Sequence, residues 1–143
     1  MPHFERQNRP LPTVVRTDGD VAELVGALLG GPIRRQTWLL LLPADGVPVQ
    51  LVVPIEDLPY EPDDHVDDLG RFIADVMPTV DATQVVVVWE RPAATTLYPV
   101  DWSWIDAVAC TFAEHEVAVR AQVLLHDAGA DVIDLRDDEL ALA

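Results

Sequence analysis

Two short stretches of the chain, residues 37–42 and residues 85–88, are almost entirely apolar. Such runs predict strands that are buried on both faces of a sheet. From residue 117 to residue 126 the apolar positions recur at every second residue, which predicts a strand with one exposed face or edge. The residues expected on its buried face are Val117, Val119, Ala121, Val123 and Leu125.

Three further stretches have the spacing of amphipathic helices. In the first, Asp20 is the expected N-cap, Glu23 completes a capping-box pattern, and Gly30 ends the helix. The second helix is expected to begin near Asp63 and to end at Pro78, because proline cannot continue a helix.

The third predicted helix begins at Asp101, the expected N-cap, and runs to about Glu116. Trp102 falls on its apolar arc and is expected in the core, whereas Trp104 falls beside that arc. Tyr98 lies in the preceding loop, so Tyr98 and Trp104 form a candidate protein interface, because exposed tyrosine and tryptophan often anchor interfaces. Packing of Trp104 against the loop is the alternative.

Turn residues at 43–46 and 127–129 predict a hairpin near each end of the sheet. The element order is therefore α-β-β-α-β-α-β-β, with parallel crossovers in the middle and antiparallel pairs at the ends. We predict a three-layer α/β domain with a mixed sheet over residues 18–136. A flexible arm (residues 1–17) precedes this domain, and an acidic tail (residues 137–143) follows it.

The charge of the chain is strongly negative. It has 25 acidic against nine basic residues, all nine of them arginine, and a formal net charge of −16. Such a chain repels phosphate, so neither nucleic-acid binding nor anionic-membrane binding is expected. Solubility is the simplest interpretation of the charge. A basic protein partner, or imitation of DNA toward a DNA-binding protein, is the more specific one.

The remaining composition points to an intracellular globular domain. Cys110 is the single cysteine, so no internal disulfide forms, and a cytoplasmic location is expected. The longest apolar run, residues 38–44, is too short to span a membrane. The acidic residues at 63–68 suit the first turn of a helix better than a metal site. No common catalytic or nucleotide-binding motif occurs, and no cofactor is expected.

Charged residues gather where the parallel strands are predicted to end, which is where α/β sheets bind ligands. They are Glu90, Arg91, Asp101 and His126. These four residues form a candidate crevice, in which Arg91 could clamp a carboxylate or phosphate while a carboxylate moves protons. The alternative is that Glu90 and Arg91 are solvated loop charges and that Asp101 only caps a helix.

The order of elements over residues 34–135 resembles the RadC-type JAB (JAMM/MPN) domain, with a cytidine-deaminase-like arrangement as the alternative. The resemblance implies a zinc ion held by two histidines of a His-x-His-Pro motif and by an aspartate, with a glutamate that activates water. In this chain Trp89 and Arg91 stand at the histidine positions, Pro92 matches the proline, and Asp101 lies within about one position of the acidic ligand.

An arginine has no lone pair to offer zinc, and the strand at residues 36–42 contains no glutamate. The resemblance therefore implies a degenerate, non-catalytic member. We accordingly predict a protein-binding or adaptor module that binds a protein partner or associates with itself, for example as a homodimer. The alternatives are a small-molecule enzyme that uses Glu90, Arg91 and Asp101, and an acidic decoy of a DNA-binding protein.

Overall fold

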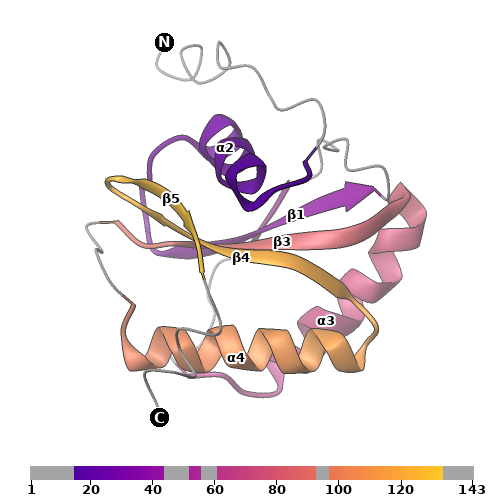
Figure 1. Cartoon of the computed structure of the whole chain (residues 1–143). Helices are drawn as coiled ribbons and strands as arrows, with labels where there is room; N and C mark the ends of the chain where they lie inside the picture. Colours follow the sequence, from indigo (N-terminus) through magenta and orange to yellow (C-terminus); the bar gives the residue numbers. More distant parts are fainter. Residues whose placement is uncertain (1–14, 44–51, 56–60, 93–96, 134–143) are drawn as a thin grey trace.

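The computed structural model has one five-stranded mixed sheet with helices on both of its faces (Figure 1). The structure describes residues 15–43, 52–55, 61–92 and 97–133. The elements are α2 (Asp18–Leu29), β1 (Gln36–Pro43), β2 (Val52–Ile55), α3 (His65–Val76), the 3-10 helix η1 (Met77–Val80), β3 (Ala82–Glu90), α4 (Pro99–Glu114), β4 (Ala118–His126) and β5 (Gly129–Val132). This order confirms the predicted sequence of helices and strands. Residues 44–46 of the predicted turn, most of the predicted arm and the whole predicted tail lie outside the described residues.

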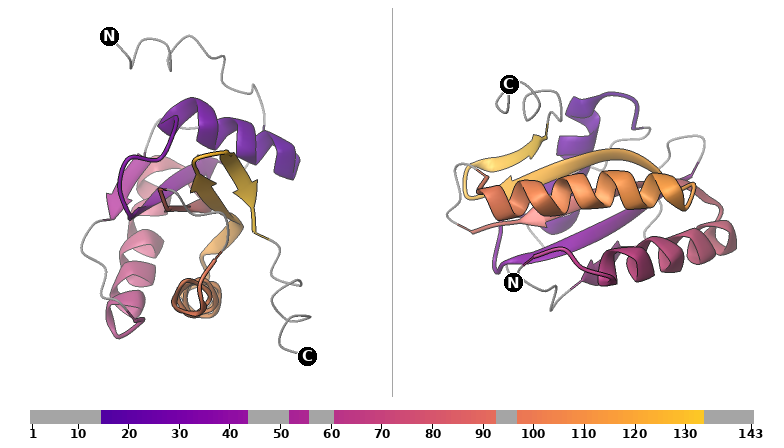
Figure 2. Two further views of the ribbon diagram at one scale, coloured as in Figure 1. Left: turned by 90° about the vertical axis from the view of Figure 1, so that its left-hand side faces the viewer. Right: turned by 90° about the horizontal axis from the view of Figure 1, so that it is seen from below.

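The strands are arranged in the order β2-β1-β3-β4-β5. Only β3 and β4 are parallel neighbours, and every other neighbouring pair is antiparallel. Helix α2 covers one face of the sheet, and α3 and α4 cover the other (Figure 2). The three layers and the mixed sheet were both predicted. None of the helices in the described ranges is long and apolar enough to cross a membrane.

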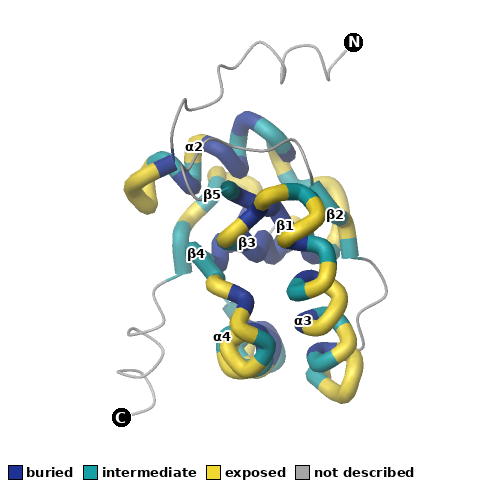
Figure 3. The backbone as a smooth tube through the Cα atoms, turned by 90° about the vertical axis from the view of Figure 1, so that its right-hand side faces the viewer, coloured by how far each residue is buried: buried dark blue, intermediate teal, exposed yellow. Residues whose placement is uncertain are grey.

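The core consists of two apolar clusters, one on each face of the sheet. In β3, Val85 and Val87 contact the cluster beneath α3 and α4, whereas Val86 and Val88 contact the cluster beneath α2. These four valines are completely buried, as the continuous apolar run predicted. Figure 3 shows this central part of the sheet as buried backbone between partly exposed helices.

Helix α2 begins earlier than predicted, because Thr17 rather than Asp20 is its N-cap. The Thr17 hydroxyl accepts a hydrogen bond from the Asp20 backbone N–H at 3.1 Å, and the Asp20 carboxylate accepts one from the Thr17 N–H at 3.1 Å. The two residues thus form a capping box one turn before the predicted one. Gly30 ends the helix, as predicted, with a positive φ of 70°.

Helix α4 also begins before the predicted cap. Tyr98 is its N-cap, and Asp101 is the third helical residue. Trp104 is only 2% exposed, so of the two alternatives for this residue the exposed interface position was wrong. Trp102, which was predicted in the core, is only partly buried. The error has a physical cause: Asp101 is itself buried, and this polar residue shifts the centre of the buried face toward Trp104.

Strand β4 contains a β-bulge that breaks the predicted alternation. Val119 pairs with Val85, but the next β3 residue, Val86, pairs with Ala121, so Arg120 is the extra residue. The extra residue reverses the faces of the strand. Val119 therefore packs toward α4, whereas Ala121 packs toward α2. The expectation that all five alternating residues share one face was wrong for this reason.

The side chain of His115, the C-cap residue of α4, contacts helix α3. The His115 Nε2 atom lies 2.7 Å from an Asp67 carboxylate oxygen. Gly70 lies directly beneath the His115 ring, since a Cβ atom at position 70 would be 2.8 Å from the ring Cδ2 atom. A residue larger than glycine would therefore displace the ring or the helix.

Candidate functional site

Three segments meet at the end of the sheet where β3 finishes. They are the last residues of β3, the first turn of α4, and the connection from α2 to β1 at residues 30–35. Gln36, the first residue of β1, lies opposite Glu90 in the antiparallel register, which brings this connection over the end of β3. The predicted residues Glu90, Arg91 and Asp101 all lie here and are 3%, 6% and 2% exposed.

Glu90 binds the α2–β1 connection through hydrogen bonds to both of its carboxylate oxygens. One oxygen accepts the backbone N–H groups of Ile33 and Arg34, the latter at 3.0 Å. The other accepts Gln36 Nε2 at 3.0 Å and Trp38 Nε1 at 2.7 Å. Burial by itself raises the pKa of Glu90, but these hydrogen bonds outweigh it and hold the pKa below its ordinary value.

Asp101 joins the start of α4 to Arg91. Its Oδ1 atom lies 3.1 Å from Arg91 Nε and 3.1 Å from Arg35 Nη2, and its Oδ2 atom accepts the Tyr98 backbone N–H at 3.1 Å. Burial opposes ionisation of Asp101, but the hydrogen bonds from Tyr98 and Arg91 and the two guanidinium charges lower its pKa overall. The carboxylate is therefore charged at neutral pH.

Arg91 also binds backbone carbonyl groups and a tryptophan ring. Its Nη1 atom donates to the backbone carbonyl oxygens of Gln36 at 3.1 Å and Glu90 at 2.8 Å. The guanidinium carbon lies 5.5 Å from the centre of the Trp89 ring, a cation–π distance. Burial and the nearby charge of Arg35 lower the pKa of Arg91, but an arginine stays protonated at physiological pH.

The strand-end network, by which we mean Arg35, Glu90, Arg91 and Asp101 with their partners, is hydrogen-bonded at each of its buried side chains, whereas the Arg35 side chain is half exposed. In the part of the chain that the structure describes, no buried side-chain nitrogen or oxygen lacks a hydrogen-bond partner. The alternative of solvated loop charges was wrong for Glu90 and Arg91, because both are buried. Such an arrangement holds three chain segments together and leaves its carboxylates little capacity to move protons.

The fourth predicted crevice residue, His126, belongs to the β4–β5 hairpin instead. Its Nδ1 atom accepts the Ala128 backbone N–H at 3.2 Å, and its Nε2 atom lies 2.6 Å from an Asp131 carboxylate oxygen. None of the hydrogen bonds found among the described residues connects the His126 side chain to the strand-end network. His126 thus stabilises a turn.

Several residues of this region were not predicted from the sequence. Arg35, Gln36 and Trp38 precede Glu90 by more than fifty positions, since the hydrogen bonds Gln36–Glu90 and Trp38–Glu90 span 54 and 52 residues. Gln122 is a further buried partner: it accepts Trp89 Nε1 at 2.8 Å and donates to the Ile105 carbonyl at 3.0 Å. A glutamine within a largely apolar strand was the sequence feature that could have predicted this buried hydrogen-bonding residue.

Two exposed apolar side chains flank the network. Ile33 is 71% exposed and Tyr98 is 61% exposed, and both donate their backbone N–H to a network carboxylate. Tyr98 therefore has the exposure that the interface prediction requires. Beside Ile33 the surface forms a groove of about 460 Å³, which is lined by Leu28, Leu29, Gly31, Ile33, Arg34, Gln36, Trp38, Val52, Pro54 and Glu90.

The described residues contain no group of three or more His, Cys, Asp or Glu side chains arranged to hold a metal ion. In the acidic stretch that begins α3, Asp63 instead binds His65 at 2.7 Å, and Asp67 binds Arg71 at 2.8 Å. No known family model matches the chain, and no curated protein matches it either.

Proposed function

We propose that this chain is a non-catalytic protein-binding module whose binding face lies at the end of β3. The observation that carries the proposal concerns two residues with exposed side chains, Ile33 and Tyr98. The backbone N–H of Ile33 donates to the buried Glu90 carboxylate, and that of Tyr98 donates to the buried Asp101 carboxylate. A surface fixed in this way loses little conformational freedom when a partner binds. Tyrosine is also among the residues that most often dominate binding energy in interfaces.

The state of the charged residues supports a non-catalytic role. A general acid or base must reach the proton that it transfers, and a clamping arginine needs free N–H groups. Glu90 and Asp101 are buried and hydrogen-bonded, and Arg91 donates to Asp101 and to two backbone carbonyl groups. An enzyme built on these residues would first have to open the network.

The same face offers a groove next to Ile33. Most of its lining is apolar, and its polar residues are Arg34 together with Gln36 and Glu90, which are bonded to each other. A mostly apolar groove of this kind suits an apolar side chain of a partner. We propose further that the chain is a degenerate relative of the RadC-type JAB domain, in which the buried residues Trp89 and Arg91 replace the zinc-binding histidines.

The test uses the full chain as bait together with Tyr98→Ala and Ile33→Ser. Phe72→Ser is the matched control, because Phe72 is also an exposed apolar residue (49%) but lies on α3. We expect Tyr98→Ala to weaken binding of a purified partner by about tenfold or more, which corresponds to about 1.4 kcal/mol, while Phe72→Ser leaves it unchanged.

Native mass spectrometry of the chain purified without chelators tests the alternative of a working metal or ligand site. A metal ion or small molecule retained in stoichiometric amount would contradict the proposal and favour a working site at Glu90, Arg91 and Asp101. Equal binding of the partner by the wild-type chain, Tyr98→Ala and Ile33→Ser would contradict the proposed face.

A further inference from the structure

Among the residues that the structure describes, nothing pairs with the outer edge of the first half of β4. Strand β5 pairs with β4 only from Val123 to His126, and one further hydrogen bond, from Ile133 N–H to the Gln122 carbonyl at 2.8 Å, ends the ladder. Beyond that bond, none of the residues that the structure describes pairs with the outer edge of residues 118–121. The unpaired backbone groups of a strand edge are a template for another strand.

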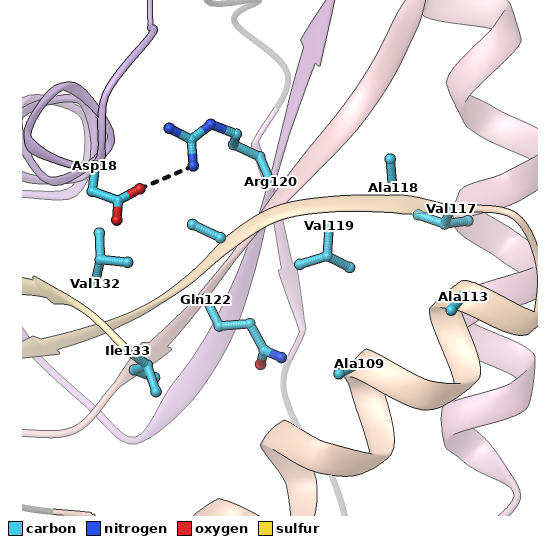
Figure 4. Close-up of a pocket in the computed structure, with 11 residues that line it drawn as sticks. Asp18, Ala109, Ala113, Val117, Ala118, Val119, Arg120, Gln122, Val132 and Ile133 are labelled. Atoms are coloured by element: carbon cyan, nitrogen blue, oxygen red, sulfur yellow. Dashed lines mark hydrogen bonds and ion pairs between the residues drawn. The ribbon is translucent and has the colours of Figure 1, made fainter. Parts of the chain in front are cut away.

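A mostly apolar groove lies beside this edge (Figure 4). Its volume is about 460 Å³. Figure 4 shows Val119 reaching from β4 toward the side of α4 that carries Ala109 and Ala113. These alanines are too small to fill the space between the helix and the strand. Ile133, at the end of the described ladder, lines the same groove.

The two charged residues that line this groove, Asp18 and Arg120, are bonded to each other. The Arg120 side chain turns toward α2, where it binds the Asp18 carboxylate at 3.0 Å and the Arg16 carbonyl at 3.1 Å. Val119, the preceding residue, packs toward α4. Val119 thus faces the apolar part of the groove, whereas the Arg120 side chain lines the groove on the α2 side of β4.

The edge of β2, on the far side of the sheet, is blocked by contrast. Strand β2 has only four residues, and one of them is Pro54, which has no N–H group to donate. Proline and short length are common protections of sheet edges. Residues 118–121 include no proline, so β4 presents the better acceptor for an added strand.

We infer that the edge of β4 and the groove beside it bind an extended segment of a protein partner by strand addition. The segment has apolar side chains at every second position, because only one face of an added strand points into the groove. Basic side chains occupy the alternate positions, because the chain carries a net charge of −16 and electrostatic complementarity favours a basic partner. This inference rests on the proposed function as a protein-binding module but assigns a second surface.

The test measures hydrogen exchange of the backbone amides of residues 118–121 in the full chain, with and without a short synthetic peptide of alternating valine and lysine. A peptide of the same composition, with its valines and lysines in two separate blocks, is the control. We expect the alternating peptide to slow exchange at these amides severalfold and the block peptide to have no such effect.

Two variants on α4 locate the binding. Ala113→Glu places a charge in the groove and is expected to weaken peptide binding by about tenfold. Ser103→Glu, at an exposed position outside the groove, is expected to leave peptide binding unchanged. Tyr98→Ala is expected to leave peptide binding unchanged, so a failure of this inference is distinguishable from a failure of the face proposed above.

Three results would overturn the inference. Equal binding of both peptides would show attraction by charge alone. Slow exchange in the free chain that is lost on removal of residues 134–143 would identify the chain's own end as the occupant. Slow exchange that depends on chain concentration would identify a second copy.

Discussion

Arg91 and Asp101 form a buried ion pair, with 3.1 Å between Arg91 Nε and Asp101 Oδ1. The pair connects the residue that follows β3 to the first turn of α4, and the same carboxylate also binds Arg35. A buried charge is tolerated only where it is paired and hydrogen-bonded. The pair therefore fixes the geometry of this end of the sheet.

Glu90→Gln is predicted to destabilise the protein by about 2 kcal/mol or more. The glutamine NH₂ group would face N–H donors that now point at a carboxylate oxygen, and a buried donor without a partner costs roughly 1–3 kcal/mol. Denaturant unfolding measures the change, and Glu23→Gln, at an exposed position of α2, is the control. Faster hydrogen exchange at Ile33 and Arg34 should accompany the loss, since Glu90 binds both amides.

The free energy of unfolding is predicted to fall in acid through Glu90 and Asp101. Both carboxyl groups have folded-state pKa values below their ordinary values of 4.5 and 3.8. Their stabilisation is therefore complete above those ordinary values and is lost as the pH falls through the lower folded-state values. Unfolding measured from pH 7 downward tests this. Glu90→Gln should lose less stability in acid than the wild-type chain, and an unchanged acid dependence would count against the assignment.

Gly70→Ala is predicted to destabilise the protein by about 1 kcal/mol, although alanine favours helices over glycine by a similar amount. The new Cβ atom would lie 2.8 Å from the His115 ring, and overpacking typically costs about 1–3 kcal/mol. Gly31→Ala is the control, because nothing lies within 4 Å of a Cβ atom there. In a His115→Ala background the same Gly70 substitution should become stabilising. If it stayed destabilising, the His115 contact would not be its cause.

The hydrophobic pattern was sufficient to predict the elements, their order and the three layers. Continuous apolar runs identified β1 and β3, because strands covered on both faces have no polar face. The pattern failed where a polar residue is buried or an extra residue is inserted. Asp101 displaced the buried face of α4 toward Trp104, and the bulge at Arg120 reversed the faces of β4.

The strand-end residues were predicted only in part. Glu90, Arg91 and Asp101 were recognised because they follow a strand or begin a helix, positions that α/β sheets bring together. Their burial depends on the α2–β1 connection, whose Arg35 lies 66 residues from Asp101. The local pattern of apolar and polar residues cannot predict a contact between residues so far apart in the sequence. His126 was included because it ends a parallel strand, but its partner is Asp131, five residues away.

The most direct test of the central claim, that the buried charges hold the fold rather than perform chemistry, is the stability of Asp101→Asn. This change keeps the shape of the side chain and removes the charge that Arg91 and Arg35 bind. We predict a loss of roughly 3 kcal/mol in denaturant unfolding, as when one partner of a buried ion pair is removed. Asp75→Asn, at an exposed position of α3, should change stability by less than about 0.5 kcal/mol. An Asp101→Asn protein as stable as the wild-type chain, or more stable, would contradict the account, because that is the behaviour of residues kept for activity.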